Sequence, residues 1–158
     1  MAEKSGAPGR TAIPGAGDLP RRFRLEIVTP ERQLVTEEVD ALTAPGLDGE
    51  FGVLPQHTRL MTALGIGEVA YRSGTVWQHL AVAAGFVEVL PDRVIILAQT
   101  AELAQEIDVA RARAAAERAE KKLAHPDADT EVSQAGAALR RALVRLRTAK
   151  RGLAGGVA

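Results

Sequence analysis

The amino-acid sequence changes character near residue 100, and this change constrains the fold more than any other feature of the chain. Before it, short apolar segments are separated by Gly and Pro, a pattern typical of β-strands joined by tight turns. After it, residues 102–124 contain neither Gly nor Pro and are dense in Ala, Glu, Arg and Lys, which favour helices. We therefore expect an all-β part followed directly by a helical part.

The first part contains many short strand candidates at close spacing. Phe23-Arg24-Leu25-Glu26-Ile27 alternates apolar and charged residues, as a half-buried strand does. Strands are expected over residues 23–27, 33–36, 39–44, 50–53, 60–64, 68–72, 76–83, 85–90 and 93–97. Turn residues at 72–75 and at Pro91-Asp92 predict two hairpins. Many short strands in this arrangement indicate a β-sandwich or a flattened barrel.

Two helices are expected in the second part. The first would span residues 102–124 and end at the sequence His-Pro-Asp-Ala-Asp over 125–129. The second would run from about 131 to 151, with Asp129 or Thr130 as its N-cap. Gly152, Gly155 and Gly156 would end it. Because the connection is short, the two helices should form an antiparallel hairpin.

The interface of this hairpin is expected to be mostly alanine. Leu139, Leu143 and Leu146 fall on one face of the second helix, flanked by Ala135, Ala138, Ala142 and Ala149. Burying a methyl group contributes at most about 0.8 kcal/mol, against about 1–2 kcal/mol of backbone entropy for each residue ordered. The leucine stripe is too short for a sustained coiled coil. The helical part should therefore be a marginal, detachable arm.

The composition excludes several kinds of chemistry. The 158 residues suffice for one domain or two small ones, and with 3% aromatic residues the core must consist of Val, Leu, Ile and Ala. There is no cysteine, which excludes disulfides, thiolate zinc sites and cysteine nucleophiles. No apolar run approaches the ~20 residues that span a bilayer. Residues 1–21, rich in Gly, Ala and Pro, are expected to be a disordered extension.

Charge is balanced overall but not locally. The formal net charge is +0, which argues against a chain that coats nucleic acid along its whole length. From Leu139 onward, however, the helical part carries Arg140, Arg141, Arg145, Arg147, Lys150 and Arg151 with no acidic residue among them. Such a patch indicates either an acidic partner or an ordinary solvated face.

Catalytic constellations are not found in the sequence. Neither a Ser-His-Asp order nor a His-x-x-x-His metal spacing occurs, so we expect no catalytic residue and no metal site. Gly46, Gly49 and Gly52 do not precede a Gly-Lys-Ser/Thr sequence, which excludes a P-loop. A rigid β module with a helical arm suits a coupling or regulatory subunit. The alternatives are a nucleic-acid-binding module that uses the basic helix and a small hydrolase on a β-sandwich.

Three segments resemble one known family, the epsilon subunit of the bacterial F-type ATP synthase. They are Gly49-Glu50-Phe51-Gly52-Val53-Leu54-Pro55-Gln56-His57-Thr58-Arg59-Leu60, Gly85-Phe86-Val87-Glu88-Val89 and Ile107-Asp108-Val109-Ala110-Arg111-Ala112. The resemblance covers roughly residues 22–151. The family usually has Gly at the position of Gln56 and Pro at that of Arg59, so the turn after Pro55 departs from the family pattern.

The resemblance implies an α+β fold and a role without catalysis. An N-terminal antiparallel β-sandwich, or flattened barrel, over residues 22–100 would dock on the gamma subunit and the c-ring. A C-terminal antiparallel helical hairpin over residues 101–158 would fold against the sandwich or extend along gamma. Extended, it would contact acidic groups on the beta subunits and inhibit ATP hydrolysis. The protein would then be a central-stalk subunit of the proton-translocating synthase, peripheral to the cytoplasmic face of the bacterial plasma membrane.

The resemblance also implies two sets of site residues. Some family members bind a regulatory ATP on the folded hairpin, and the residues that match their pattern are Glu102, Ile107, Asp108, Arg111, Ala112, Arg141 and Arg145. The three arginines are assigned to the phosphates, and Glu102 and Asp108 to the adenine or ribose. An ordinary ion pair between Asp108 and Arg111 is the alternative. Contact with the acidic beta groups is assigned to Arg140, Arg141, Arg145, Arg147, Lys150 and Arg151.

Overall fold

The computed structural model describes residues 21–125 and 129–154, and it has the α+β fold expected from the sequence. The extension expected over residues 1–21 lies outside the described residues except for Arg21. Eight strands come first: β1 Phe23–Val28, β2 Gln33–Val39, β3 Ala41–Gly46, β4 Gly49–Val53, β5 Leu60–Leu64, β6 Gly67–Ser73, β7 Val76–Val89 and β8 Arg93–Leu103. A 3-10 turn, η1 Ala104–Glu106, leads to the helices α1 Val109–Ala124 and α2 Asp129–Ala154.

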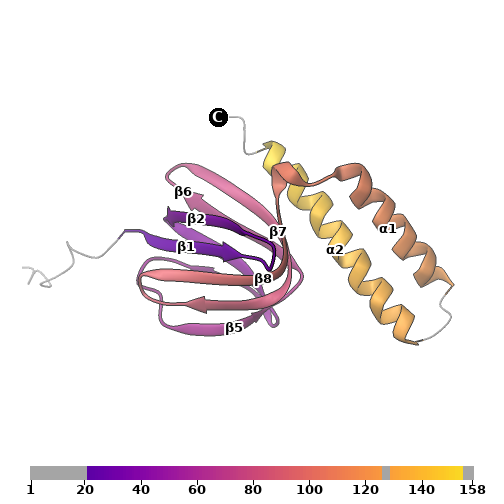
Figure 1. The fold of residues 1–158 in the computed structure, drawn as a ribbon, viewed down its shortest axis with the longest axis horizontal. Helices are drawn as coiled ribbons and strands as arrows, with labels where there is room; N and C mark the ends of the chain where they lie inside the picture. The colour runs from indigo at the N-terminus through magenta and orange to yellow at the C-terminus, as the bar shows by residue number, and fades with distance from the viewer. Residues whose placement is uncertain (1–20, 126–128, 155–158) are drawn as a thin grey trace, which may run out of the picture.

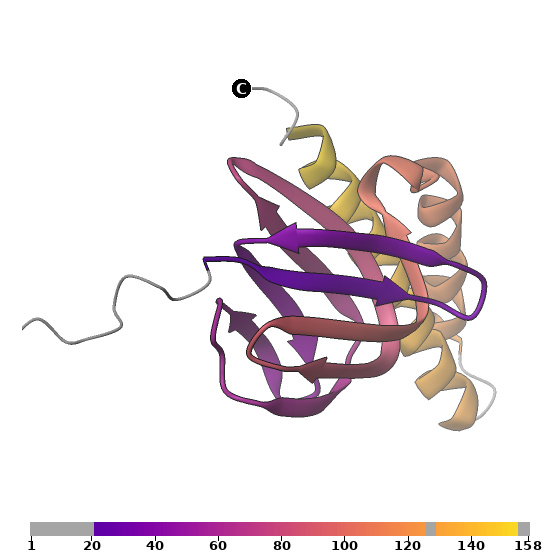
Figure 2. The same cartoon turned by 60° about the vertical axis from the view of Figure 1, so that its left-hand side comes forward.

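The strands form a flattened barrel whose pairing is continuous except at β2 and β4, which each pair with one strand only. The order is β2-β1-β8-β7-β5-β3-β4, and β6 pairs with both β3 and β7. All pairings are antiparallel except that of β1 with β8, which is parallel. The long strands β7 and β8 cross from one layer to the other (Figures 1 and 2). The helical hairpin lies against one side of this body, with α2 between the sandwich and α1 (Figure 1).

Strand β7 differs from the sequence prediction of two strands over 76–83 and 85–90. Both segments belong to one strand, because its pairing with β8 continues from Ala83↔Thr100 to Gly85↔Ala98. The bend is absorbed by Ala84 and Gly85, whose φ angles are 55° and 134°. A Cβ on Gly85 would lie 2.0 Å from the Leu97 carbonyl oxygen, so only glycine fits there.

The turn after Pro55 places a long side chain where glycine is favoured. Gln56 has φ 66°, in the left-handed region, and its N–H donates to the Pro91 carbonyl at 3.1 Å. The departure from the family's glycine is therefore a substitution into the same backbone conformation, held in place by the neighbouring hairpin.

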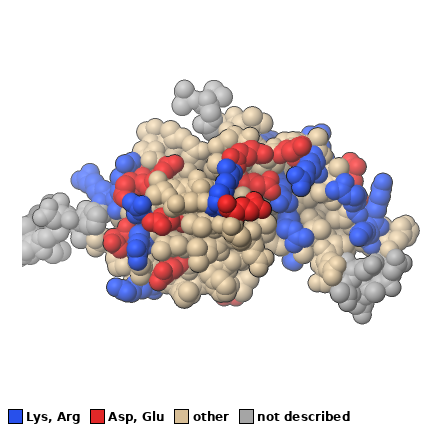
Figure 3. All heavy atoms as spheres, viewed as in Figure 1, with Lys and Arg blue, Asp and Glu red and all other residues tan. Residues whose placement is uncertain are grey.

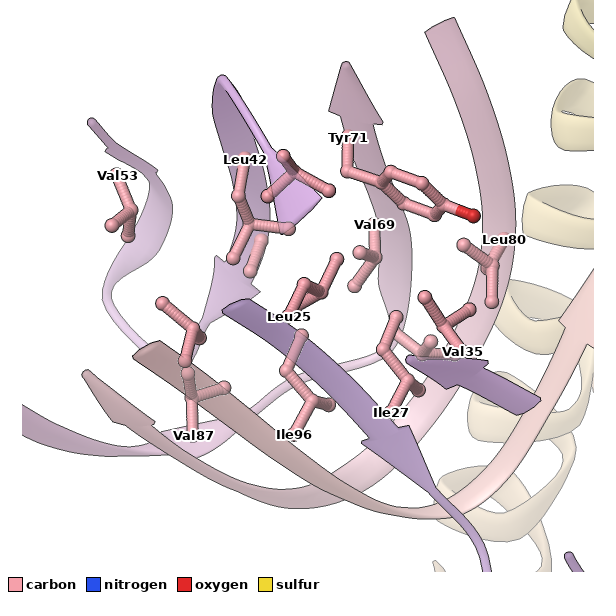
Figure 4. Close-up of a cluster of buried hydrophobic side chains, with 14 of the residues drawn as sticks. Leu25, Ile27, Val35, Leu42, Val53, Val69, Tyr71, Leu80, Val87 and Ile96 are labelled. Atoms are coloured by element: carbon pink, nitrogen blue, oxygen red, sulfur yellow. The ribbon is translucent and has the colours of Figure 1, made fainter. Parts of the chain in front are cut away.

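The core lies between the two layers of strands and is aliphatic, as expected (Figure 4). Leu25, Ile27, Val53, Val87 and Ile96 are almost completely inaccessible to solvent. Alternation along the strands directs these side chains inward and leaves their neighbours on the outer face. The body is thus built without any contribution from the arm.

The first helix begins later than the sequence predicts. Glu102 belongs to β8, because Leu103 and Glu102 pair with Leu80 and Ala81 of β7, and this pairing overrides their helix propensity. Helix α1 starts at Val109, where the Asp108 carboxylate caps it. Helix α2 extends beyond both expected ends and continues through Gly152.

The interface between the helices is mostly alanine, as expected. Ala112, Ala116 and Ala119 are the buried residues of α1, and α2 contributes the buried Ala135 and Ala142. Leu143 is 50% exposed, so the leucine stripe contributes less than the sequence suggested. The arm is accordingly held by small side chains.

Neither α1, α2 nor η1 is long and apolar enough to cross a membrane. In residues 21–125 and 129–154, no three His, Cys, Asp or Glu side chains come together in a way that could hold a metal ion.

Candidate functional site

Helix α2 is seated on the sandwich through a small apolar contact. Ala149 packs with Ala81 of β7 and with Ile107, and Val144 lies partly buried beside them. At the end of the helix, a Cβ on Gly152 would lie 2.4 Å from the Ala104 Cβ, so a larger residue would force α2 away from η1. The seat is therefore close-fitting but buries little apolar surface.

An ion pair between α2 and the end of β8 reinforces this seat. Arg145 donates from Nε to Oε1 of Glu102 at 2.8 Å, and its Nη2 lies 2.7 Å from the same oxygen. The two side chains are 28% and 36% exposed, so water screens the pair in part. It connects the arm to the sandwich.

A second polar contact surrounds Glu68 of β6, which lies beneath α2. Thr148 donates from Oγ1 to Oε2 at 3.0 Å, and Arg151 donates from Nη1 to Oε1 at 2.6 Å. Nδ1 of His79, on β7, lies 3.1 Å from Oε1. Burial by itself raises the pKa of Glu68, but the hydrogen bonds from Arg151, Thr148 and His79 outweigh it and hold the pKa below its ordinary value. The carboxylate is therefore stabilised in its charged form.

A cavity of about 420 Å³ lies where β8, η1 and the two helices meet. Its volume is within the range of small-molecule sites, roughly 300–1,000 Å³. The residues lining it are Glu102, Glu106, Asp108, Arg111, Ala112, Ala115, Arg118 and Arg145. Three of them are acidic and three are arginines.

The acidic residues of this cavity already have partners. Glu102 pairs with Arg145, and Glu106 pairs with Arg32. Asp108 accepts the backbone N–H of Arg111 at 2.9 Å, as an N-cap. Within residues 21–125 and 129–154, neither Arg111 nor Arg118 forms an ion pair. The cavity therefore presents two guanidinium groups without an ion-pair partner among the described residues, against one such carboxylate, Asp108, and this excess of positive charge favours an anion.

The residues expected to bind ATP are mostly, but not all, brought together. Glu102, Asp108, Arg111, Ala112 and Arg145 line the cavity. Ile107 does not, because it packs under the helix with Ala81 and Ala149. The capping bond of Asp108 goes to the backbone of Arg111, not to its guanidinium.

Arg141 lies in a neighbouring cavity, also of about 420 Å³, formed between α1 and α2. Arg118 and Lys122 line that cavity with it, and Ala115 and Arg118 are shared by both cavities. Arg118 was not recognised from the sequence. The signal was its position seven residues after Arg111, which puts both on one face of α1.

Apart from Arg141, which is partly buried in the second cavity, the basic residues of α2 divide into two groups. Arg145 and Arg151 are paired with carboxylates of the sandwich. Arg140, Arg147 and Lys150 are exposed. On the face drawn in Figure 3, Lys and Arg side chains gather over the helical hairpin. In this conformation the exposed basic residues face solvent, whereas the paired ones help to keep the helical arm docked on the sandwich.

The outer face of the sandwich carries an apolar patch. Phe86 and Leu97 are directly paired across β7 and β8, and Met61 is diagonal to Phe86 on β5. Their exposures are 57%, 53% and 73%. Neighbouring apolar side chains at this exposure are typical of a surface that binds another protein.

Two family models match this chain, one over the sandwich and one over the helical part. Residues 22–104 match the family model described as ATP synthase, Delta/Epsilon chain, beta-sandwich domain. Residues 105–150 match the model described as ATP synthase, Delta/Epsilon chain, long alpha-helix domain. Together the two models cover most of the chain.

Several curated relatives are similar over nearly their full length. The chain is 50% identical over 130 residues to an ATP synthase epsilon chain of Syntrophobacter fumaroxidans, covering 82% of this chain and 97% of that one. It is 48% identical over 136 residues to an ATP synthase epsilon chain of Dehalococcoides mccartyi, covering 82% and 94%.

Two solved structures share the fold. A chain in the cryo-EM structure of the Euglena gracilis mitochondrial ATP synthase, with OSCP, F1 and c-ring, aligns with a TM-score of 0.70 and 25% identity over 89% of this chain and 91% of that one. A chain of the Tetrahymena thermophila central stalk and c-ring aligns with a TM-score of 0.54 and 17% identity, covering 82% and 96%. The second likeness concerns the fold alone.

Proposed function

The chain belongs to the ATP synthase delta/epsilon family as an epsilon subunit of the F-type central stalk, and we propose that it couples rotor to catalytic head and restrains ATP hydrolysis with its helical hairpin. As an epsilon subunit it is a non-catalytic component of the complex. In this proposal its two parts have separate tasks.

The sandwich would provide the docking module, bound to the gamma subunit and the c-ring. Support comes from the apolar patch of Met61, Phe86 and Leu97, which lies on the paired strands β5, β7 and β8. Through these partners the protein would be held at the cytoplasmic face of the bacterial plasma membrane, on a proton-translocating synthase, without entering the bilayer.

The hairpin would be the inhibitory arm. The alanine seat and the two ion pairs that dock the hairpin on the sandwich are weak enough to break. The basic residues of the hairpin are complementary to an acidic surface on the beta subunits. When the arm extends, Arg145 and Arg151 would exchange Glu102 and Glu68 for acidic groups of beta. Arg140, Arg141, Arg147 and Lys150 would join them there.

A regulatory ATP would hold the arm down. The observation that carries this proposal is the pair of unneutralised arginines, Arg111 and Arg118, in a cavity whose acidic residues are already occupied. The phosphate chain would lie along these two and reach Arg141 through the shared wall of the second cavity. The adenine or ribose would face Glu102 and Asp108. Arginine suits this task because its planar group donates hydrogen bonds in pairs.

Binding to the folded arm alone would shift its equilibrium. The stabilisation is RT ln(1 + [L]/Kd), about 2.7 kcal/mol when ATP exceeds its Kd a hundredfold. This free energy is large compared with what an interface of alanine side chains contributes to docking of the arm. Ample ATP would keep the arm down and the enzyme active, whereas scarcity would release the arm.

Titration calorimetry of the full chain with ATP tests the site. We expect saturable binding that is weakened at least about tenfold by Arg111→Ala, because a charge-assisted contact to phosphate is lost. Arg118→Ala should do the same and should reduce the preference for ATP over AMP. Arg113→Ala is the matched control, since Arg113 is an exposed arginine of α1 outside this cavity. Equal binding by all four proteins would exclude the site.

A further inference from the structure

Two buried polar side chains contact each other at the junction of arm and sandwich. Among the described residues, the polar or charged side chains that are buried are those of Glu68, 5% exposed, and Thr148, fully inaccessible. The hydroxyl of Thr148 donates to the carboxylate of Glu68 at 3.0 Å. Burying a polar group costs free energy unless a hydrogen-bond partner is present. Thr148 on α2 and Glu68 on β6 supply this partner to each other only while α2 stays docked on the sandwich.

The partners of Glu68 come from both sides of the junction. His79, on the neighbouring strand, remains beside the carboxylate whatever the arm does. Thr148 and Arg151 are on α2 and leave with it. The carboxylate is therefore buried and neutralised by the arm, and exposed to water when the arm departs.

We propose that Glu68 is a latch that fixes the arm on the sandwich in one register and withholds Arg151 from any acidic partner. Only one part of this inference rests on the proposed function, namely that the released arm inhibits ATP hydrolysis. The latch itself is a property of the isolated chain.

The buried alanines alone do not define the register of α2, although the close approach of Gly152 to Ala104 also opposes a slide. Its buried alanines are Ala135, Ala142 and Ala149, spaced by seven residues, so a slide of one heptad would offer Ala142 to the seat that Ala149 occupies. The polar contacts distinguish the two positions. Seven residues before Thr148 and Arg151 stand Arg141 and Val144, which reproduce neither bond to Glu68. Selection of one register is the best-attested use of a buried polar contact.

Thiol labelling can measure release of the arm, because the chain contains no cysteine of its own. Ala81 is on β7, is 6% exposed and is covered by Ala149, so the thiol introduced by Ala81→Cys reports departure of the arm. In this background, Thr148→Val keeps the shape but removes the donor. We expect its labelling rate to rise at least about tenfold, the effect of losing a hydrogen bond to a buried charge. Thr148→Ser keeps the hydroxyl and should stay close to the parent protein.

A double-mutant cycle separates the latch from general loosening. Arg151→Gln leaves the buried carboxylate without its cation and should raise the labelling rate. Adding Glu68→Gln should then lower the rate again, because no unpaired charge remains under α2. Arg113→Gln, an exposed change on α1, should have no effect. The fluorescence of the single tryptophan, Trp77, should be unchanged in every variant, which shows that the sandwich stays folded.

Equal labelling of Thr148→Val and Thr148→Ser, or additive effects of Glu68→Gln and Arg151→Gln, would overturn the latch. ATP hydrolysis by the assembled synthase tests the function on which its consequence depends. Thr148→Val, which removes no charge, should lower hydrolysis by releasing an intact basic arm. Faster labelling with unchanged hydrolysis would keep the latch and reject the inhibitory role of the arm.

Discussion

Arg145 and Glu102 neutralise each other across the junction of α2 and β8, with Nε and Oε1 2.8 Å apart. Both residues belong to the set that the family pattern assigns to a nucleotide. Because they are paired, a phosphate reaches Arg145 only by displacing Glu102. Arg111 and Arg118 have no such competitor among the described residues and are better placed for the first contact.

The Arg145–Glu102 pair should contribute little to docking of the arm. Both side chains are partly exposed, and ion pairs of this kind contribute about 0.2–1 kcal/mol. We expect Arg145→Gln to raise the labelling rate of Ala81→Cys by no more than about fivefold. Glu102→Gln should behave alike. An effect as large as that of Thr148→Val would show that this pair contributes as much to docking of the arm as the contact of Thr148 with Glu68.

The sandwich should fold without the arm, and its last strand, β8, continues to Leu103. Residues 101–103 pair with Leu80, Ala81 and Val82 of β7, so a chain ending at Thr100 loses the end of β8. We expect a protein of residues 1–103 to show β-type circular dichroism and a cooperative thermal transition, and still to bind gamma. A protein of residues 1–100 should melt at a lower temperature. Equal melting temperatures would mean that the last pairs of β8 contribute nothing.

Strands could be predicted from the sequence wherever local pattern decides. The bounds of β5, Leu60–Leu64, were predicted as observed, and so was an aliphatic core. The predictions that were wrong concern segments whose structure depends on residues far away in the sequence. Glu102 has helix propensity but pairs with Ala81, and the segments on either side of Ala84 join because β8 runs alongside both.

The candidate site shows the same limit. The motif at 107–112 gave Asp108, Arg111 and Ala112, which do line the cavity, yet it also gave Ile107, which does not. Arg118 was missed because spacing on a helix matters only once the facing element is known. The contact between Glu68 and Thr148 spans 80 positions in the sequence, and no local pattern connects them.

The basic residues of α2 should inhibit hydrolysis as a group. Each exposed pair contributes about 0.2–1 kcal/mol, so single changes should have small effects. Replacing Arg140, Arg141, Arg145 and Arg147 together by Ala should raise ATP hydrolysis by the assembled synthase while synthesis continues. The control is the same number of replacements on the sandwich, at Arg22, Arg24, Arg59 and Arg93, which leaves the Arg32–Glu106 pair of the cavity in place. Unchanged hydrolysis by the α2 variant would show that these charges do not inhibit.

Gly85 should be intolerant of any side chain. Gly85→Ala combines φ 134° with a Cβ only 2.0 Å from the Leu97 carbonyl oxygen, and should destabilise the sandwich by at least about 3 kcal/mol. Gly74→Ala is the matched control, because Gly74 has φ 64° with no atom within 4 Å and should lose only about 1 kcal/mol. Urea denaturation of both variants measures the difference. Similar midpoints would refute the steric argument.

Alkaline pH should destabilise the fold through Tyr71. Burial, followed by the charge of Glu37 and the hydrogen bond to it, raises the pKa of Tyr71 to about 12. The folded state therefore holds the phenolic proton more tightly than the unfolded state, whose pKa is about 10. This contribution is complete below pH 10 and disappears as the pH rises through 12. Phenolate absorbance is unambiguous because the chain has one tyrosine, and Tyr71→Phe should remove this part of the pH dependence.

The parallel pairing of β1 with β8 sets an order of events during synthesis. Strand β1 can pair with β2 as soon as both leave the ribosome, but its other edge stays open until residues 93–97 emerge. An open edge of this kind is a template for pairing with another chain. Synthesis of β8 closes that edge and completes the sandwich just before the helical arm is synthesised. The first helical residues thus emerge onto a surface that is already formed, and the nascent chain is most exposed to aggregation before the arm exists.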